Sequence, residues 1–116
     1  MNEKDKMLSG RLYVSFGKQL VEDREKVKKA INKANCDYTL SPKARQKIIV
    51  SVLGSHGKNT YIEAPVRFDY GYNVHVGDNF YANFDCIFLD GNKISIGNNV
   101  KVGPRCSFFT ASHPIA

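Results

Sequence analysis

The fold is decided by Val76-Gly77-Asp78-Asn79-Phe80, which recurs as Ile96-Gly97-Asn98-Asn99-Val100. Each copy reads apolar, Gly, Asp or Asn, Asn, apolar, and a third partial copy opens at Val102-Gly103. Apolar side chains also recur every six residues between the two copies. A six-residue period punctuated by Gly and Asn indicates a solenoid of very short strands joined by tight turns.

This period aligns the apolar residues in two columns. The first column contains Ala64, Tyr70, Val76, Ala82 and Phe88, and the second contains Phe68, Val74, Phe80, Cys86, Val100 and Cys106. Each hexapeptide supplies one strand with its apolar side chains facing inward, and Gly or Asn accepts the positive φ of the corner. Three such strands close a triangular coil of about eighteen residues, and successive coils stack about 4.8 Å apart.

The period is interrupted between Phe88 and Ser95, where the count runs to eight instead of six. We expect the two extra residues to bulge outward in a loop formed by Asp90-Gly91-Asn92-Lys93. Residues one coil apart then differ by twenty in number. The pairs predicted to stack are Val76 over Ile96, Cys86 over Cys106 and Phe88 over Phe108.

Two helices are expected in the N-terminal third of the chain. A short helix spans residues 3–8 and ends before Gly10, and Leu12-Tyr13-Val14 follows as an apolar anchor. A longer helix spans residues 18–34, because apolar residues recur there at helical spacing with charged residues on the opposite face. These patterns predict one short and one amphipathic helix.

A third helix is expected to begin at Ser41-Pro42, a capping residue followed by proline in the first helical position. Residues 35–39 connect it to the preceding helix. Its apolar stripe contains Ile48, Ile49, Val52 and Leu53. Because isolated helices of this length are marginal in water, the stripes need a partner, and the solenoid that begins near Tyr61 is the nearest one.

The expected architecture is mainly β, with two units. Residues 1–58 form a helical cap on the N-terminal end of the solenoid, where an open strand edge would otherwise template aggregation. Residues 59–116 form a β-helix of fewer than three coils. Solenoids generally end in a polar or helical cap, and the sequence up to Ala116 contains none after the repeats, so we expect the chain to be the first part of a longer protein.

Composition narrows the functional classes. The formal net charge is +6, but most of the excess lies between Lys18 and Lys47, where basic and acidic residues alternate as on a solvated helix face, and no nucleic-acid-binding motif accompanies them. The sequence contains no run of eighteen apolar residues, which a membrane-spanning helix would need. We therefore expect a cytoplasmic protein. Cys36, Cys86 and Cys106 have no metal-binding spacing and are interpreted as structural thiols.

Several stretches together resemble the maltose and galactoside O-acetyltransferases. They are Met7-Leu8-Ser9-Gly10-Arg11-Leu12-Tyr13, Arg24, the block from Phe68 to Gly77, Asn79-Phe80-Tyr81-Ala82-Asn83-Phe84-Asp85 and Thr110-Ala111-Ser112-His113-Pro114. The resemblance implies a left-handed parallel β-helix, assembled as a homotrimer with active sites between subunits. It also implies direct transfer of an acetyl group from acetyl-CoA to a sugar hydroxyl, without a covalent acetyl-enzyme and without a metal.

The resemblance assigns roles to individual residues. His113 matches the family's catalytic base, and an imidazole with its ordinary pKa near 6.5 suits proton removal from a hydroxyl at neutral pH. Asn83 matches an asparagine that bonds the sugar or the coenzyme A arm. Asp69 and Tyr81 match positions that line the acceptor pocket.

Two further positions depart from the galactoside branch of the family. Ser15 stands where that branch has an acceptor-contacting aspartate, and Asp90-Gly91 stands where it has two acids in the extra loop. Ser15 and Asp90 are therefore predicted to contact the acceptor, whose identity the sequence leaves open. If the chain ends at Ala116, the coils that supply most of the coenzyme A groove are missing, and we expect weak or no coenzyme A binding.

Two alternatives remain at this point. A γ-type carbonic anhydrase has the same fold and binds zinc through histidines, but His75 and His113 would lie two coils apart, about 9.6 Å, too far for one metal, and His56 lies in the connector. A non-enzymatic remnant that survives as an oligomerising β-helix is the other alternative. Acetyl-transfer assays and metal analysis separate these readings.

Overall fold

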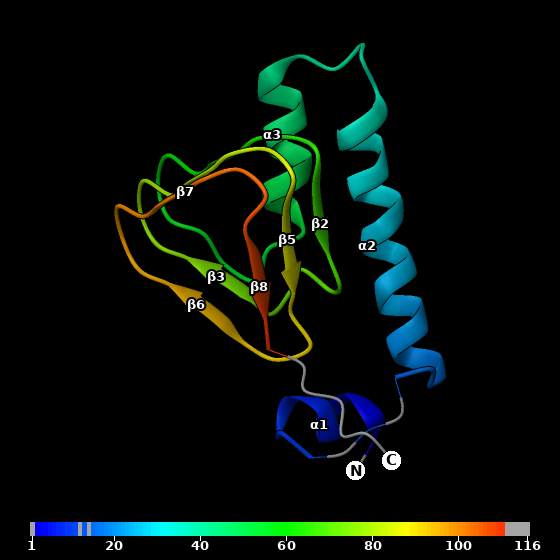
Figure 1. The fold of residues 1–116 in the computed structure, drawn as a ribbon. Coiled ribbons are helices and arrows are strands. Elements are labelled where there is room, and N and C mark those ends of the chain that lie inside the picture. Colours follow the sequence, from blue (N-terminus) through cyan, green and yellow to red (C-terminus); the bar gives the residue numbers. More distant parts are fainter. Residues whose placement is uncertain (1, 12, 14, 111–116) are drawn as a thin grey trace.

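The computed structural model describes residues 2–11, 13 and 15–110. Three helices precede the strands, namely α1 (Glu3–Leu8), α2 (Lys18–Cys36) and α3 (Pro42–Ser51). The strands are β1 (Tyr61–Ile62), β2 (Val66–Phe68), β3 (Val74–Val76), β4 (Tyr81–Ala82), β5 (Cys86–Leu89), β6 (Ile94–Ile96), β7 (Lys101–Val102) and β8 (Ser107–Phe109). Figure 1 shows the helices grouped beside a stack of short strands.

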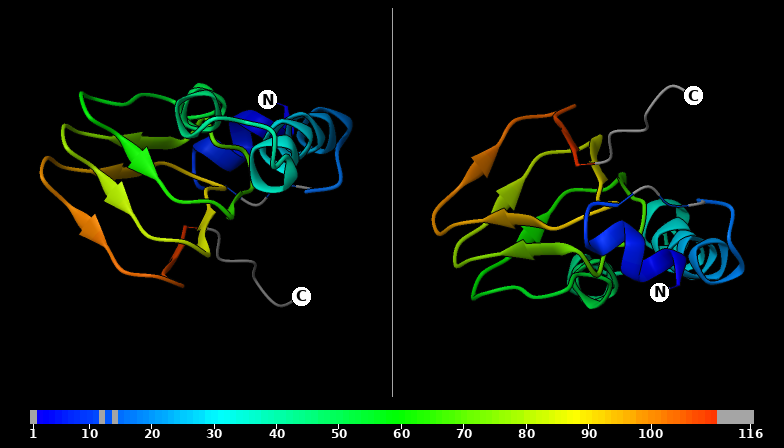
Figure 2. Two further views of the ribbon diagram at one scale, coloured as in Figure 1. Left: turned by 90° about the horizontal axis from the view of Figure 1, so that it is seen from above. Right: turned by 90° about the horizontal axis from the view of Figure 1, so that it is seen from below.

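The strands wind as a left-handed parallel β-helix, as predicted. Strands three apart in sequence pair in parallel and form three faces, with the orders β1-β4-β7, β2-β5-β8 and β3-β6. Val76 pairs with Ile96 and Phe88 with Phe108, which confirms the predicted register of twenty. Figure 2 shows the successive turns stacked in layers.

The expected eighteen-residue coil is wrong for the first turn. Tyr61 pairs with Tyr81 and Val66 with Cys86, so this coil also advances by twenty. Its two extra residues lie between β2 and β3. This segment is bonded to the Asp90–Lys93 loop of the next coil, because Tyr70 N and Asn73 N donate to the Asp90 carboxylate. The six-residue count concealed them because Tyr70 supplied an apolar residue at the expected position.

Tyr70 therefore does not belong to the inward column of the coil. Its buried side chain packs against Met7 and Leu20, outside the β-helix, with Tyr13 and Tyr72 beside it. The Asp90–Lys93 loop reaches α1 outside the coil, because Asn92 Nδ2 donates to Met7 O and to Leu8 O, each at 3.3 Å. The Asp90 side chain itself is fully buried. This corner of the triangular coil is thus an attachment surface for the N-terminal helices.

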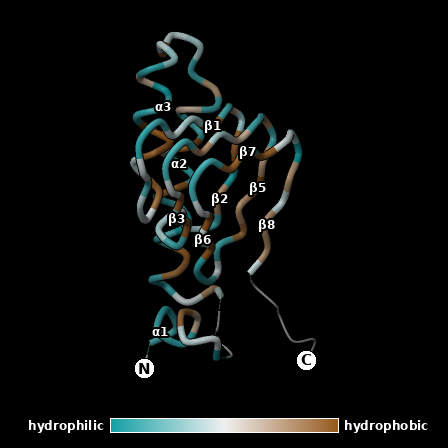
Figure 3. The backbone as a smooth tube through the Cα atoms, turned by 90° about the vertical axis from the view of Figure 1, so that its left-hand side faces the viewer, coloured by the Kyte–Doolittle hydropathy of each residue, from teal (hydrophilic) through white to brown (hydrophobic). Residues whose placement is uncertain are grey.

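The interior of the coil is apolar and closely stacked. Phe80, Val74, Ile62 and Cys86 are fully buried there. The phenyl rings of Phe68, Phe88 and Phe108 form a ladder with centroid separations of 5.2 and 5.0 Å. Figure 3 shows hydrophobic segments along β5 and β8 and hydrophilic segments at the turns. Burial of this ladder removes large apolar areas from water and fixes the strands that carry the outward-facing side chains.

A second ladder runs along one corner. Asn59, Asn79 and Asn99 have φ angles of 59°, 56° and 60°, a left-handed conformation that asparagine tolerates better than most residues. Asn59 Nδ2 donates to Asn79 Oδ1 at 3.0 Å, and Asn79 Nδ2 donates to Asn99 Oδ1 at 2.8 Å. The repeated asparagine of the sequence motif thus turns the chain and bonds the coils to one another.

The helical boundaries agree closely with the sequence analysis. The Ser41 hydroxyl accepts a hydrogen bond from Ala44 N at 3.1 Å at the start of α3, and Gly10 has a positive φ of 79° just after α1, both as predicted. The helix α2 continues to Cys36, two residues beyond the expected end. Its C-terminal carbonyls are bonded by the Arg45 guanidinium, which donates to Ala34 O and to Asp37 O.

The helices cover the first coil from its open side. Side-chain amides complete two strand edges: Asn35 bonds Val66 through N–H and C=O, and Gln46 bonds Ile62 in the same way. The third edge is covered by Ser55, which bridges to His75 in parallel. In the part of the chain that the structure describes, no helix is long and apolar enough to cross a membrane.

Candidate active site

The predicted site residues fall into two groups on different parts of the coil. Asp69 follows β2, and Ser15 lies in the segment before α2, near the same corner. Tyr81 and Asn83 belong to β4 and the corner after it. His113, the predicted base, lies outside the described residues. Within one copy of the chain, the structure brings Ser15 and Asp69 to the same corner but leaves Tyr81 and Asn83 on another face.

Arg24 organises the first group. Its Nη1 donates to the Tyr70 hydroxyl at 2.6 Å, and its Nη2 donates to the Ser15 carbonyl at 2.5 Å. Burial raises the pKa of Tyr70, and the Arg24 guanidinium opposes that rise. One guanidinium thus ties α2, the segment before it and the corner after β2 together, using its planar set of donors.

Asp69 shares this corner with Arg24. Its backbone N–H donates to Phe88 O at 3.0 Å, so the next coil fixes its position. Partial burial raises the pKa of Tyr13, and the Asp69 carboxylate adds to that rise while Arg24 lowers it. A carboxylate and a guanidinium therefore lie at one place with a tyrosine, which is a set of groups able to bond several hydroxyls at once.

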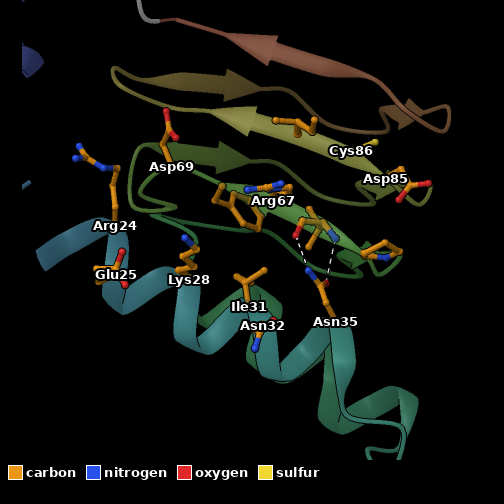
Figure 4. Close-up of a pocket in the computed structure, with 14 residues that line it drawn as sticks. Arg24, Glu25, Lys28, Ile31, Asn32, Asn35, Arg67, Asp69, Asp85 and Cys86 are labelled. Atoms are coloured by element: carbon orange, nitrogen blue, oxygen red, sulfur yellow. Dashed lines mark hydrogen bonds between the residues drawn. The ribbon is translucent and has the colours of Figure 1, made fainter. Parts of the chain in front are cut away.

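A groove extends from this corner between α2 and the β2-β5 face. It has a volume of about 600 Å³, within the range of small-molecule sites. Its lining includes Arg24, Lys28, Ile31, Asn35, Arg67, Phe68, Asp69 and Asp85. Figure 4 shows Arg24 and Asp69 at one end, Lys28 and Arg67 in the middle, and Asn35, Asp85 and Cys86 at the other end.

Tyr81 and Asn83 form the second group. The Tyr81 ring stacks on Tyr61 with a centroid separation of 6.1 Å and an interplanar angle of 11°. Asn83 is held by its backbone N–H, which donates to Val102 O at 2.9 Å, and its Oδ1 accepts from Phe84 N at 2.8 Å. Among the described residues its Nδ2 has no acceptor, so the amide retains two donors for a ligand.

The buried Asp90 carboxylate bonds the backbone of the preceding coil. Its two carboxylate oxygens accept hydrogen bonds from Tyr70 N at 2.9 Å and Asn73 N at 3.2 Å, and its own carbonyl accepts from Asn73 Nδ2 at 2.8 Å. Burial raises the Asp90 pKa to about 6, although these hydrogen bonds oppose the rise. A fully buried carboxylate whose two oxygens bond the backbone does not support the predicted contact with an acceptor.

The two histidines that the structure describes are already engaged. His75 Nδ1 lies 2.8 Å from Ser55 Oγ, and His56 Nδ1 lies 3.0 Å from Gly57 O. Residues 2–11, 13 and 15–110 contain no group of three or more His, Cys, Asp or Glu side chains placed to hold a metal ion.

Sequence reasoning missed the residues that shape the groove. Arg24 was noted only as part of a motif, and its bridging role depends on contacts to Ser15 and Tyr70 that are distant in sequence. Nothing in the sequence indicated that Lys28 and Arg67 belong to a site. Lys28 is one of several basic residues on an amphipathic helix, and Arg67 is a single basic residue in a short strand.

Comparison with known proteins identifies the class. Residues 6–57 match the maltose acetyltransferase hexapeptide capping motif. The solved structure of a maltose O-acetyltransferase from Clostridium difficile 630 superposes with a TM-score of 0.95 at 46% identity, covering 100% of this chain and 62% of that one. The cap and the coils together are thus those of a hexapeptide-repeat acetyltransferase fold.

Two further proteins are similar to this chain. The galactoside O-acetyltransferase of Escherichia coli K12 is 31% identical over 111 residues, which cover 96% of this chain and 55% of that protein. A hexapeptide-repeat acetyltransferase of Vibrio cholerae O1 biovar eltor, solved with acetyl coenzyme A, has a TM-score of 0.86 at 27% identity over 99% of this chain and 62% of its own. The chain belongs to the maltose and galactoside O-acetyltransferase family, and it spans between about half and two thirds of the length of these relatives.

Proposed function

We propose that the protein transfers an acetyl group from acetyl-CoA to a hydroxyl group of a carbohydrate acceptor. The observation that carries this proposal is the match of both cap and coils to a maltose O-acetyltransferase, at 46% identity over 100% of the chain. The Vibrio cholerae neighbour binds acetyl coenzyme A in its solved structure, which supports the same cosubstrate here.

The acceptor is proposed to lie at the Arg24 end of the groove. Asp69 lines the groove there beside Arg24, and Ser15 is tied to the same guanidinium. A carboxylate accepts and a guanidinium donates, so this pair suits the alternating donor and acceptor character of neighbouring sugar hydroxyls. Asp90, which is buried, is left out of the proposed acceptor contacts.

His113 is proposed to act as the general base. Its imidazole takes the proton of the acceptor hydroxyl as the hydroxyl oxygen attacks the thioester carbonyl carbon. A C–O bond forms, the C–S bond breaks, and the departing coenzyme A sulfur takes up a proton. Asn83, with two free amide donors in the described part of the chain, is proposed to bond the acceptor or the coenzyme A arm.

The site is proposed to combine residues of two neighbouring copies in a homotrimer. The separation of Ser15 and Asp69 from Tyr81 and Asn83 on different faces of one coil supports this proposal. A cyclic oligomer presents one face of each copy to a different face of the next, so both groups meet at every interface.

The test is an acetyl-transfer assay of the protein with acetyl-CoA and, as acceptors, glucose, maltose and galactosides, each neutral and with a phosphate or carboxylate group. We expect transfer to at least one acceptor and a loss of about 10²- to 10⁴-fold in His113→Ala, the usual contribution of a general base. His56→Ala is the control, since His56 is exposed and bonds only its neighbour's carbonyl among the described residues. Unchanged transfer in His113→Ala would show that His113 is not the general base. The absence of transfer to any acceptor would favour a non-catalytic β-helix.

A further inference from the structure

Two basic side chains enter the middle of the groove from opposite walls. Lys28 comes from α2 and Arg67 from β2, and both line the groove. Figure 4 shows Lys28 directed from the helix toward the strands, with Arg67 lying along β2 above it. Both residues are exposed, so a ligand in the groove can reach them.

Neither cation is neutralised by the protein. The ion pairs found among the described residues involve Lys4, Lys6 and Lys18, and no carboxylate lies within 4.0 Å of the Lys28 or Arg67 cationic groups in that part of the chain. Their side chains also make none of the hydrogen bonds found there. Two like charges on facing walls repel each other, and an anion placed between them removes that repulsion.

The other charges of the groove are placed differently. Arg24 donates to Tyr70 and to Ser15, and it lies with Asp69 at one end, while Asp85 lies at the opposite end. Glu25 also lines the groove, but it makes no ion pair with Lys28 within 4.0 Å. The central section is therefore locally positive although the groove as a whole carries both signs.

The lining of the groove also includes apolar residues. Ile31 is buried, Phe68 and Ile87 are partly buried, and all three line the groove. A ligand that extends from the Arg24 end thus reaches the two cations, with Ile31 beyond Lys28 along α2. This combination fits an organic group that ends in a negative charge.

We propose that the acceptor carries an anionic group, a phosphate or a carboxylate, which binds between Lys28 and Arg67. The inference rests on the proposed acetyl transfer to a carbohydrate at the Arg24 end of the groove. Arg67 supplies a planar pair of donors that matches either anion, and Lys28 supplies a point charge. The groove thereby selects charged sugars or glycosides over neutral ones.

Calorimetry with three ligands tests the proposal. The ligands are a hexose 1-phosphate, a 4-carboxyphenyl hexoside and the 4-nitrophenyl hexoside of the same shape without a net charge, each in the glucose and galactose series. We expect at least one anionic ligand to bind about 10-fold or more tightly than the nitrophenyl hexoside, the effect of a charge-assisted hydrogen bond. A preference for the hexose 1-phosphate assigns phosphate, and a preference for the 4-carboxyphenyl hexoside assigns carboxylate.

Two variants locate the effect. Lys28→Gln and Arg67→Gln should each reduce the ratio of anionic to neutral affinity toward one, and added salt should reduce it in the unmodified protein. Lys29→Gln is the matched control, because Lys29 is an exposed neighbour on α2 outside the lining of the groove, and it should retain the ratio.

Equal affinity for charged and neutral hexosides, no binding of any anionic ligand, or a ratio unchanged in both variants would overturn the proposal. Because binding is measured without turnover, its outcome is separate from that of the proposed function. A protein that binds anionic hexosides but acetylates none contradicts only the function. A protein that acetylates neutral sugars and shows no anionic preference contradicts only this inference.

Discussion

Gln46 closes the free edge of the first coil by bonding both backbone groups of Ile62. Its Oε1 accepts from Ile62 N at 2.9 Å, and its Nε2 donates to Ile62 O at 2.7 Å. Ile62 is fully buried, so its backbone groups have little access to water. One side chain of α3 thus replaces the strand that would otherwise precede β1.

Replacing Gln46 by methionine should destabilise the protein by about 2 kcal/mol. Methionine keeps the length of the side chain but leaves one donor and one acceptor of the strand unpaired, and each orphaned buried group costs about 1–3 kcal/mol before water reaches it. Urea unfolding measures the change. Gln19→Met, an exposed change on α2, is the control and should stay within about 0.5 kcal/mol. Equal effects at the two positions would show that the clamp contributes nothing.

Arg24 and Tyr70 should be energetically coupled by about 1 kcal/mol or more. Their hydrogen bond of 2.6 Å joins α2 to the corner that carries Asp69, and the guanidinium also lies 5.6 Å from the ring centroid. A double-mutant cycle with Arg24→Met and Tyr70→Phe measures the coupling by urea unfolding. Additive changes would indicate that the corner is held by packing against Met7 and Leu20 alone.

Stability should fall as the pH rises from 4 to 7, because of Asp90. Its folded-state pKa of about 6 lies above the ordinary 3.8, so the folded protein binds this proton more tightly than the unfolded chain does. The resulting stabilisation is complete below about pH 3.8 and is lost as the pH passes about 6. It amounts to about 3 kcal/mol at most.

Asp90→Asn isolates this contribution. The amide cannot titrate, and its NH₂ group cannot accept the second backbone N–H, so the variant should be less stable at every pH but lack this pH-dependent loss. The free energy of unfolding is measured at pH 4.5 and at pH 7 for the unmodified protein and for Asp90→Asn. The change between the two pH values is then compared between the two proteins. The same pH dependence in both proteins would assign it to other groups.

The sequence was sufficient to predict the coil and the register where the motif is explicit. Val76 and Ile96 carry the same local signal, and their pairing follows from it. Tyr70 was misplaced because its apolar character fits a six-residue column equally well whether it faces the coil or α1 and α2. Periodicity reports that a residue is buried, but it does not report against which surface.

The cap clamps and the buried carboxylate could not be predicted for a related reason. Gln46, Asn35 and Asp90 are polar residues whose partners are backbone groups, and backbone groups leave no trace in the sequence. The groove could not be predicted either, because Lys28 and Arg67 come to line one groove only when α2 lies along β2. Local propensity therefore determined the elements, whereas their contacts depended on pairings distant in the chain.

Mixing two inactive variants should restore activity if the site is shared between copies. Asp69→Ala and Asn83→Ala alter groups on different faces, so a mixed trimer contains interfaces where an intact Asp69 meets an intact Asn83. Random one-to-one mixing creates such an interface at about a quarter of the sites of a cyclic trimer. The control mixes Asp69→Ala with Arg24→Ala. Both residues belong to one corner of the same copy, so every site keeps one defect and activity should stay low. No recovery in the first mixture would place Asp69 and Asn83 of each site within a single copy. Recovery in the control would show that Asp69 and Arg24 of one site come from different copies.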